Sequence, residues 1–128
     1  MGSAAEGVME TLLVVEDDVH QAKLYKQELE EDNYTVVLAH DGHEALKKLE
    51  EEDIDLVILD ISMPGMDGIE ALGKILGRDN TMPVIIHTAY AQYKDNFMTW
   101  TAEHYIIKSS DLGELKAKVH EVLDQRSK

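Results

Sequence analysis

The stretch from Ile54 to Gly68, which reads IDLVILDISMPGMDG, decides the fold that we predict for this chain. Its unbroken apolar run, Leu56 to Leu59, is typical of a strand buried on both faces, because neither face then meets water. The run ends on Asp60, directly before a loop that contains proline and glycine. Sites in open α/β sheets lie at the carboxyl ends of strands, so Asp60 is a candidate site residue. An acid that only ends the strand is the alternative interpretation.

Strand and helix patterns alternate along the whole chain. We predict five strands, at residues 11–15, 34–39, 56–59, 83–88 and 104–107. We also predict five helices. The first begins within residues 16–18 and ends at 31, the third begins at 66 or 67 and ends at 77, and the others span 43–52, 91–100 and 111–125. Asp111 is the expected N-cap of the last helix, and Glu114 is placed to complete a capping box. Five such repeats with short links predict an α/β fold with a five-stranded, doubly wound parallel sheet.

The composition is that of an ordinary globular protein, with 128 residues of which 44% are hydrophobic and 30% charged. We expect one domain over residues 11–126, after a flexible lead or cloning remnant at residues 1–10, and no effector domain in this sequence. No apolar run is long enough to cross a bilayer, and residues 1–9 do not resemble a signal peptide. The absence of cysteine excludes disulfides and fits a reducing compartment. We therefore predict a cytoplasmic protein.

The formal net charge is −14, and the basic residues are scattered along the chain. Such a surface repels phosphate backbones and anionic lipids unless a basic patch is concentrated somewhere. We therefore predict no direct binding to nucleic acid or to membranes. Most of the acids lie near the ends of predicted helices, where a solvated surface explains them.

Polar residues directly follow four of the predicted strands. They are Glu16 and Asp17 after the first, Asp60 after the third, Thr88 after the fourth and Lys108 after the fifth. Parallel strands end at one edge of the sheet, so these side chains are expected to gather there. Three neighbouring carboxylates repel one another, and a cation relieves that repulsion. Oxygen ligands alone favour a hard ion, and a few carboxylates plus water suit Mg²⁺.

The lysine and the threonine would then lie opposite the metal. A metal, an ammonium and a hydroxyl around a carboxylate make a phosphoryl pocket with Asp60 as the nucleophile. Each residue also has a plainer explanation, since Thr88 fits β-propensity and Lys108 fits a solvent-exposed side chain. Their joint placement at one edge favours the pocket.

These residues lie in motifs that resemble the receiver domain of two-component response regulators. The motifs are VVEDD at residues 14–18, LDISMPGMDG at 59–68, HTA at 87–89 and YIIK at 105–108, and the match runs from about residue 11 to 123. The resemblance implies a flavodoxin-like sheet with strand order 2-1-3-4-5. It also implies a phosphorelay role, in which a histidine kinase or a histidine phosphotransfer protein donates the phosphoryl group and an unknown downstream protein reads the result.

The resemblance assigns the metal site and the acceptor residue by position. Asp60 would accept the phosphoryl group as an aspartyl phosphate. Asp17, Asp60 and the backbone carbonyl of Ser62 would bind Mg²⁺ directly, and Glu16 would hold the water molecules of the metal. Mn²⁺ is an expected substitute for Mg²⁺.

The same resemblance assigns the residues that respond to phosphorylation. Lys108 would pair with a phosphoryl oxygen and Thr88 would bond another, while Tyr105 would turn inward as the aromatic switch. Ser62 and Tyr90 stand where the family tunes loss of the phosphoryl group, and the Tyr90 ring is expected to slow that hydrolysis. The chain would catalyse its own phosphorylation and dephosphorylation without turning over a separate substrate.

The sequence departs from the family after Lys108, where Ser109 replaces the customary proline. A cis bond costs about 2.5 to 4 kcal/mol before a residue other than proline, so we expect a trans bond and a differently shaped loop. The segment from residue 88 to 108 is also shorter than usual, which predicts a short or displaced fourth helix. These departures leave open how the switch is read out.

Two other functions remain open on the sequence. A pseudo-receiver scaffold without phosphorylation is one, and the departures at Ser109 and in the fourth helix favour it. A Mg²⁺-dependent phosphatase with an aspartyl nucleophile is the other. Phosphatases of the haloacid dehalogenase type carry a second acid two residues past the nucleophile, however, and that position here holds Ser62.

The histidines provide no second site. His40 and His43 lie three residues apart with only Asp41 and Glu44 beside them, so we predict no zinc there. His87 lies in an apolar strand, and we predict a hydrogen-bonded core residue.

Overall fold

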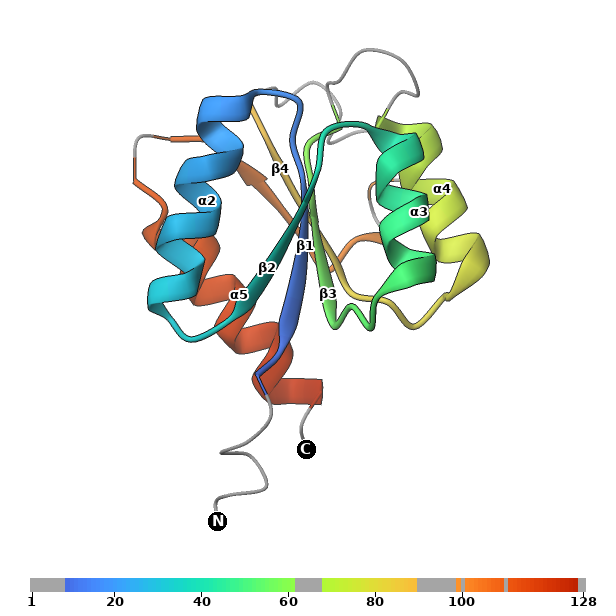
Figure 1. Ribbon diagram of the computed structural model, residues 1–128. Coiled ribbons are helices and arrows are strands. Elements are labelled where there is room, and N and C mark those ends of the chain that lie inside the picture. The colour runs from blue at the N-terminus through green and yellow to red at the C-terminus, as the bar shows by residue number, and fades with distance from the viewer. Residues whose placement is uncertain (1–8, 62–67, 90–98, 100, 110, 127–128) are drawn as a thin grey trace.

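The computed structural model describes residues 9–61, 68–89, 99, 101–109 and 111–126. Within these residues five strands form one parallel sheet in the order β2-β1-β3-β4-β5 (Figure 1). The strands are β1 (Thr11–Val15), β2 (Thr35–Ala39), β3 (Leu56–Leu59), β4 (Val84–Thr88) and β5 (His104–Ile107). The predicted fold class and strand order are confirmed.

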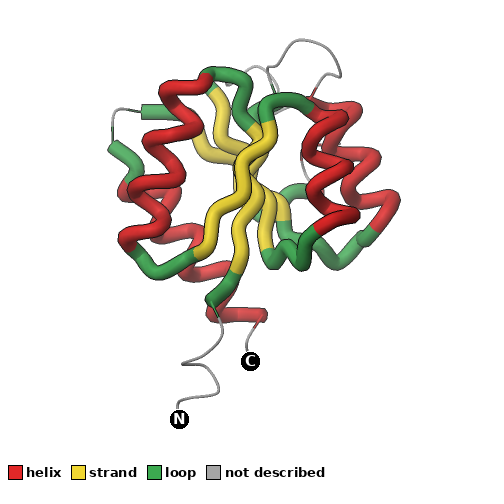
Figure 2. The backbone as a smooth tube through the Cα atoms, viewed as in Figure 1, coloured by secondary structure: helices red, strands yellow, loops and turns green. Residues whose placement is uncertain are grey.

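Helices cover both faces of this sheet, as Figures 1 and 2 show. The helices are α2 (Val19–Glu31), α3 (Gly42–Glu51), α4 (Gly68–Arg78) and α5 (Gly113–Arg126). The α2 and α5 helices lie on one face, and α3 and α4 lie on the other. None of the helices in the described part of the chain is long and apolar enough to cross a membrane.

The core consists of two apolar layers, one on each face of the sheet. Successive strand residues point to opposite faces, so β1 sends Leu12 and Val14 toward α2 and α5 and sends Leu13 and Val15 toward α3 and α4. All four side chains are at most 1% exposed. This two-sided burial explains why β1 and β3 read as continuous apolar runs in the sequence.

The observed elements agree closely with the predicted ones. The bounds of β1, β3 and β5 are as predicted, and the other described elements differ by at most three residues. For example, β4 begins at Val84 because Pro83 has no N–H to donate, although its carbonyl accepts the N–H of Val57 at 3.0 Å. The helix predicted over residues 91–100 lies outside the described residues, except for residue 99. At the last helix Leu112 is the N-cap, because its carbonyl accepts the first helical bond, from the N–H of Lys116 at 2.9 Å.

The prediction of Asp111 as the N-cap with a capping box is therefore wrong by one residue. The Asp111 carboxylate instead accepts the N–H of Gly113 at 2.8 Å, and the Asp111 N–H donates to Ser109 Oγ at 3.3 Å. A short loop closed by its own side chains thus leads into α5, and this loop follows Lys108 directly.

The first residue of α4 lies against the backbone that follows β3. The N–H of Gly68 donates to the carbonyl of Ile61 at 3.2 Å, and a Cβ at Gly68 would lie 2.0 Å from the Cα of Ile61. This contact requires glycine for reasons of space. It fixes the chain directly after Asp60, which places the start of α4 close to the site.

We predict that Gly68→Ala lowers the free energy of unfolding by about 2 kcal/mol or more, because the backbone at Ile61 must move to admit the methyl group. Gly77→Ala is the matched control in the same helix. A Cβ there meets nothing within 4 Å, so alanine should stabilise the protein by about 0.5 to 1 kcal/mol through helix propensity. Urea unfolding measures both values. Equal stabilities would contradict the close approach at Gly68.

Candidate functional site

The hydrogen-bond ladder of the sheet brings the carboxyl ends of four strands together, those of β1, β3, β4 and β5. Val15 pairs with Leu59 in register, and the N–H of Asp60 donates to the Val15 carbonyl at 3.1 Å. Farther along the same edge, the N–H of Lys108 donates to the Thr88 carbonyl at 2.7 Å. The residues that directly follow β1, β3 and β5 therefore lie beside one another and beside the last residue of β4.

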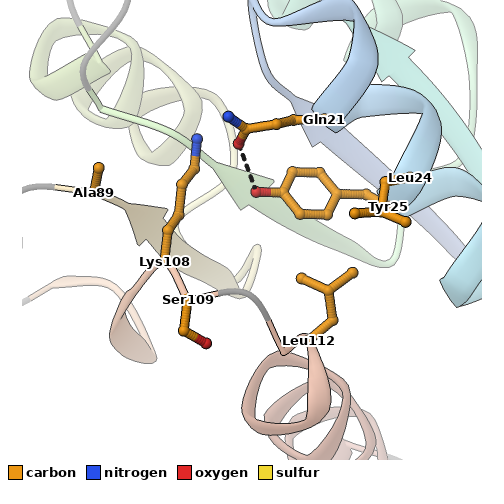
Figure 3. Close-up of a pocket in the computed structure, with 7 residues that line it drawn as sticks. All are labelled: Gln21, Leu24, Tyr25, Ala89, Lys108, Ser109 and Leu112. Atoms are coloured by element: carbon orange, nitrogen blue, oxygen red, sulfur yellow. Dashed lines mark hydrogen bonds between the residues drawn. The ribbon is translucent and has the colours of Figure 1, made fainter.

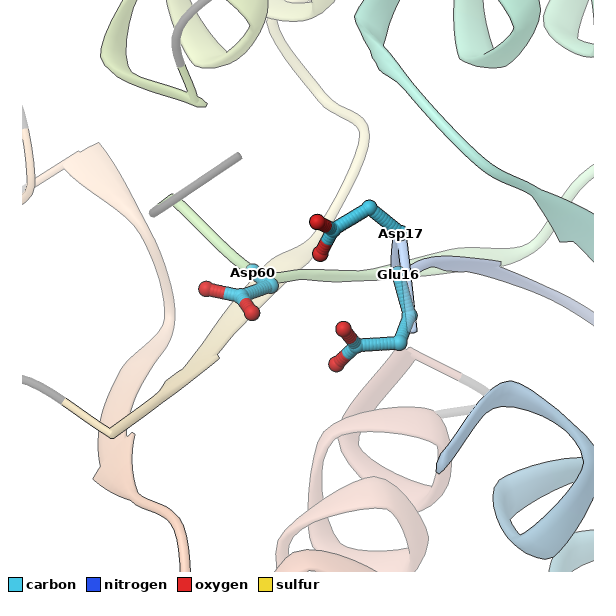
Figure 4. A group of neighbouring side chains, drawn as sticks. All are labelled: Glu16, Asp17 and Asp60. Atoms are coloured by element: carbon cyan, nitrogen blue, oxygen red, sulfur yellow. The ribbon is translucent and has the colours of Figure 1, made fainter. Parts of the chain in front are cut away.

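Three carboxylates meet at this edge (Figure 4). Glu16, Asp17 and Asp60 each place a carboxylate oxygen within 4.8 Å of the others. Asp18 does not join them, because it caps α2 and accepts the N–H groups of His20 and Gln21 at 2.9 and 3.1 Å. One acid of the Glu16 to Asp18 run thus has a structural role, and two acids remain for the site.

Lys108 supplies the positive charge that two of these acids need. Its Nζ donates to Glu16 Oε1 at 2.6 Å and to Asp60 Oδ2 at 2.9 Å. The side chains of Lys108, Glu16 and Asp60 are 15%, 2% and 8% exposed, so the ion pairs are shielded from water. The second oxygen of Glu16 accepts the N–H of Asp18 at 3.1 Å. These bonds hold Glu16 and Asp60 in fixed positions.

The buried charges shift one another's ionisation. Burial alone would lower the pKa of Lys108, but its hydrogen bonds to Glu16 and Asp60 outweigh burial and raise this pKa above its ordinary value. Burial raises the pKa of Glu16, and the bond from Lys108 opposes that rise. Lys108 is therefore held in its charged form, and its bond to Glu16 favours the charged form of that carboxylate against the effect of burial.

The two predicted switch residues lie on the α3 and α4 side of the sheet. Thr88 is fully buried at the end of β4. Tyr105 is half-buried in β5, packs against the apolar cluster on that side and pairs in register with Ile86. Thr88 and Tyr105 thus occupy neighbouring strands on one face. The predicted positions Ser62 and Tyr90 lie outside the described residues.

The bond between Lys108 and Ser109 is trans, as expected without proline. Ser109 Oγ donates to the carbonyl of Asp111 at 2.9 Å, which closes the loop before α5. A cavity of about 290 Å³ opens beside this loop and beside Lys108 (Figure 3). Its lining comes from α2, the residue after β4, this loop and the start of α5, namely Gln21, Leu24, Tyr25, Ala89, Lys108, Ser109 and Leu112.

Sequence reasoning missed the pairing of Tyr25 with His87 below this cavity. Their ring centroids are 5.4 Å apart, and both residues are 3% exposed. His87 is a core residue as predicted, but its Nδ1 has no hydrogen-bond partner among the described residues, so the predicted bond is absent at that atom. Tyr25 and Leu29 are buried residues four positions apart in α2, and that spacing alone gives no sign that Tyr25 packs against His87.

The donor set at the edge fits a divalent metal. Three carboxylates offer oxygen ligands only, and Asp17 is exposed while Glu16 and Asp60 are buried. Hard cations such as Mg²⁺ bind to a few carboxylates and keep several water molecules, which an edge that is open on one side allows. Asp17 and Asp60 would bind the metal directly, and Glu16 would hold water molecules of the metal.

Comparison with known proteins agrees with this geometry. The family model described as "Response regulator receiver domain" matches residues 12–120. This chain belongs to the response regulator receiver domain family. The response regulator protein TrrA of Thermotoga maritima, solved in complex with Mg²⁺ and beryllium fluoride, is 42% identical with a TM-score of 0.85, over 88% of this chain and 98% of that one. The acidic cluster thus fits the metal site of a receiver domain.

Other relatives of this receiver domain extend the comparison. A structure of TrrA in complex with the histidine kinase ThkA covers 90% of this chain and 99% of that one, with 42% identity and a TM-score of 0.84. The response regulator ArlR of Staphylococcus epidermidis is 36% identical over 117 residues, which are 90% of this chain and 53% of ArlR. The chain thus spans about half the length of the curated relatives that it matches.

We predict that Lys108→Met lowers the free energy of unfolding by about 3 to 5 kcal/mol in the absence of divalent metal, because Glu16 and Asp60 are left buried without a counter-charge. Lys26→Met is the matched control, since Lys26 pairs with Glu30 at 2.7 Å but both side chains are more than 40% exposed. Lys26→Met should lower the free energy of unfolding by about 1 kcal/mol or less. Urea unfolding in EDTA compares the two, and equal losses would contradict the shielding of the Lys108 pairs.

We also predict that His87 makes the receiver domain less stable in mild acid. Burial and the charge of Lys108 lower the pKa of His87 from 6.5 to about 4, while Asp60 opposes the shift. The unfolded chain therefore binds the proton first as the pH falls. The free energy of unfolding should thus fall by up to about 3 kcal/mol through His87 as the pH drops from about 6.5 to about 4.

The measurement for this second prediction is urea unfolding at several pH values. His87→Leu should show a shallower loss of stability toward pH 4 than the wild type. The exposed His43→Gln variant is the control and should keep the wild-type slope. A wild-type slope in His87→Leu would show that other groups cause the acid sensitivity.

Proposed function

We propose that this receiver domain accepts a phosphoryl group on Asp60 and passes the signal on by a change of partner. The observation that carries the proposal is the Lys108 ammonium, which bridges Glu16 and Asp60 beside the three-carboxylate cluster. A carboxylate that is held in place, with a cation and a metal site next to it, can serve as nucleophile toward phosphorus. The proposed domain spans residues 11–126.

The proposed transfer uses a phosphohistidine of the partner as donor. The bond between phosphorus and the histidine nitrogen breaks, the nitrogen leaves with the electron pair, and an oxygen of Asp60 forms the new bond to phosphorus. Mg²⁺, or Mn²⁺ in its place, would neutralise charge on the phosphoryl oxygens when bound. Lys108 would exchange its bond to Asp60 for a bond to one of these oxygens, which its raised pKa favours by keeping it charged.

The remaining roles are proposals that rest on the family resemblance. Thr88 would bond a phosphoryl oxygen and Tyr105 would turn inward in response; their positions on neighbouring strands support this coupling. The carbonyl of Ser62 would complete the ligands of the metal. Ser62 and Tyr90 would set how fast the phosphoryl group is lost.

The proposed donor is a histidine kinase or a histidine phosphotransfer protein. TrrA, which is 42% identical to this chain, was solved in complex with the histidine kinase ThkA, and this supports a histidine kinase as the partner. The downstream target is a further protein, and neither nucleic acid nor membrane is a proposed partner, in line with the net charge of −14. The proposed location is the cytoplasm, where such kinases present their phosphohistidine.

We predict that acetyl phosphate with Mg²⁺ adds the mass of one phosphoryl group to the protein. Asp60→Asn should abolish the addition, because an amide oxygen cannot act as the nucleophile, and EDTA should abolish it in the wild type. Intact-mass spectrometry in a time course measures the labelled fraction. Beryllium fluoride with Mg²⁺ should also raise the melting temperature of the wild type but not of Asp60→Asn, since a ligand that binds only the folded state stabilises it.

The matched control is Asp53→Asn, which replaces an exposed aspartate before β3 at the opposite edge of the sheet. It should label like the wild type. A label that persists in Asp60→Asn would place the acceptor elsewhere. No label on the wild type, together with no response to beryllium fluoride, would instead favour the scaffold that the sequence left open.

A further inference from the structure

The β2 strand forms one edge of the sheet, because among the described residues β1 is its only neighbour. The N–H of Thr35 donates to the Glu10 carbonyl at 2.9 Å, and the Ala39 carbonyl accepts the N–H of Glu16 at 2.9 Å. Both bonds run toward β1. Every second residue of β2, from Thr35 to Ala39, therefore turns its backbone groups toward the inside of the sheet.

The residues between them turn their backbone groups outward, because the direction of these groups alternates along a strand. They are Val36 and Leu38, and His40 continues the alternation directly after β2. A strand from another molecule can pair with such a row of N–H and C=O groups. The outward row of β2 is thus a surface where two chains can join unless something prevents it.

Two charged side chains bond the ends of this outward row. Lys26 of α2 donates from Nζ to the Val36 carbonyl at 3.2 Å, and Glu44 of α3 accepts the N–H of His40 with Oε1 at 2.7 Å. The two helices lie on opposite faces of the sheet, so the side chains reach the edge from opposite sides (Figure 1).

A second copy of this chain would need the same two backbone groups. In an antiparallel pair of β2 strands centred on Leu38, the Val36 carbonyl of one copy would accept the N–H of His40 in the other. Lys26 already bonds that acceptor, and Glu44 already bonds that donor. A second copy must therefore displace both side chains or take their charges out of water, and burial of a charge is costly.

Each of the two side chains also has a plainer contact within its own helix. Lys26 pairs with Glu30 at 2.7 Å, and both side chains are more than 40% exposed. Such a pair at positions i and i+4 forms without any carbonyl partner, so the bond to the strand is an additional one. Glu44 donates its N–H to Asp41 Oδ1 at 2.8 Å, at the N-cap of α3. A test must therefore separate the edge from the helices.

We propose that Lys26 and Glu44 block the β2 edge against antiparallel pairing with the β2 edge of a second copy. The inference concerns association between copies, and it does not rest on the proposed function. Repulsion between copies that each carry a net charge of −14 also opposes association, but salt screens that repulsion. Measurements at high salt therefore test the two side chains themselves.

The decisive variant combines Lys26→Met with Glu44→Ala and is called the edge variant. The control variant combines Lys74→Met with Glu70→Ala in α4. Lys74 lies 3.8 Å from Glu70 in an i,i+4 pair whose side chains are more than 50% exposed, and Glu70, like Glu44, lies in the first turn of its helix. Each variant loses one positive and one negative charge, so the net charge stays at −14.

The first measurement is sedimentation velocity over a series of protein concentrations, in EDTA and about 1 M salt, where the Debye length is only about 3 Å. The wild type and the control variant should stay monomeric. The edge variant should form a dimer, and any association of the wild type should be at least about tenfold weaker, because each pair of copies loses the two blocking bonds on both edges.

The second measurement is amide hydrogen exchange by NMR at two residues of β2. Val37 pairs in register with Leu13 and turns its N–H toward β1, so this amide should exchange slowly in every variant. The N–H of Leu38 turns outward and should exchange fast in the wild type and in the control variant. In the edge variant it should slow by about tenfold or more once the dimer forms, because the partner strand then accepts it.

A wild type that dimerises with a protected Leu38 amide would overturn the proposal, because its edge would then be open. The proposal also fails if the edge variant associates no more than the control variant, or associates without protection at Leu38. If the edge variant does not fold, Lys26→Met alone is compared with Lys74→Met, since both lose only an exposed pair. Lys26→Met should then associate about threefold or more tightly, and equal association would overturn the proposal.

Discussion

The ion pairs of Lys108 with Glu16 and Asp60 are the interaction on which the functional edge of this molecule depends. Two carboxylates that are nearly excluded from water, at 2% and 8% exposure, repel each other and lack hydration. The ammonium supplies both the missing charge and the missing hydrogen bonds. It also holds Asp60 in place through the bond at 2.9 Å before any metal or donor arrives, so the site is organised in advance of its chemistry.

The parallel sheet makes this arrangement possible, and the lengths of the side chains match it. Neighbouring strands lie about 4.8 Å apart, and the order β1-β3-β4-β5 puts Asp60 between Glu16 on one side and Lys108 two strands away on the other. The two flanking residues have long side chains that reach inward, whereas the central acid is short. Lys108 extends past the end of β4, where the buried Thr88 lies. A change of strand order would separate these groups, whatever their spacing in the sequence.

The sheet and the residues at its strand ends could largely be predicted from local sequence patterns. The apolar runs at β1 and β3 indicated strands covered on both faces, and their repetition with helices indicated a parallel sheet, because only helices on both sides bury such runs. Parallel strands end at one edge, so the acids after β1 and β3 and Lys108 after β5 were expected together. The N-cap of the last helix was predicted one residue too early, at Asp111. Aspartate is a common N-cap residue, and the sequence does not show that this one bonds the N–H of Gly113 from the preceding loop.

The sequence by itself determined the strands, the fold class and the polar residues at the strand ends, because apolar periodicity and the residue after each run are local properties of the chain. Only the tertiary structure decided which groups touch. It joined Lys108 to Glu16 rather than to Asp17, and it assigned Asp18 to the cap of α2. It also packed the ring of Tyr25 against that of His87, although these two residues are 62 positions apart along the chain. Contacts of that kind depend on how two elements pack, and no pattern within either element encodes them.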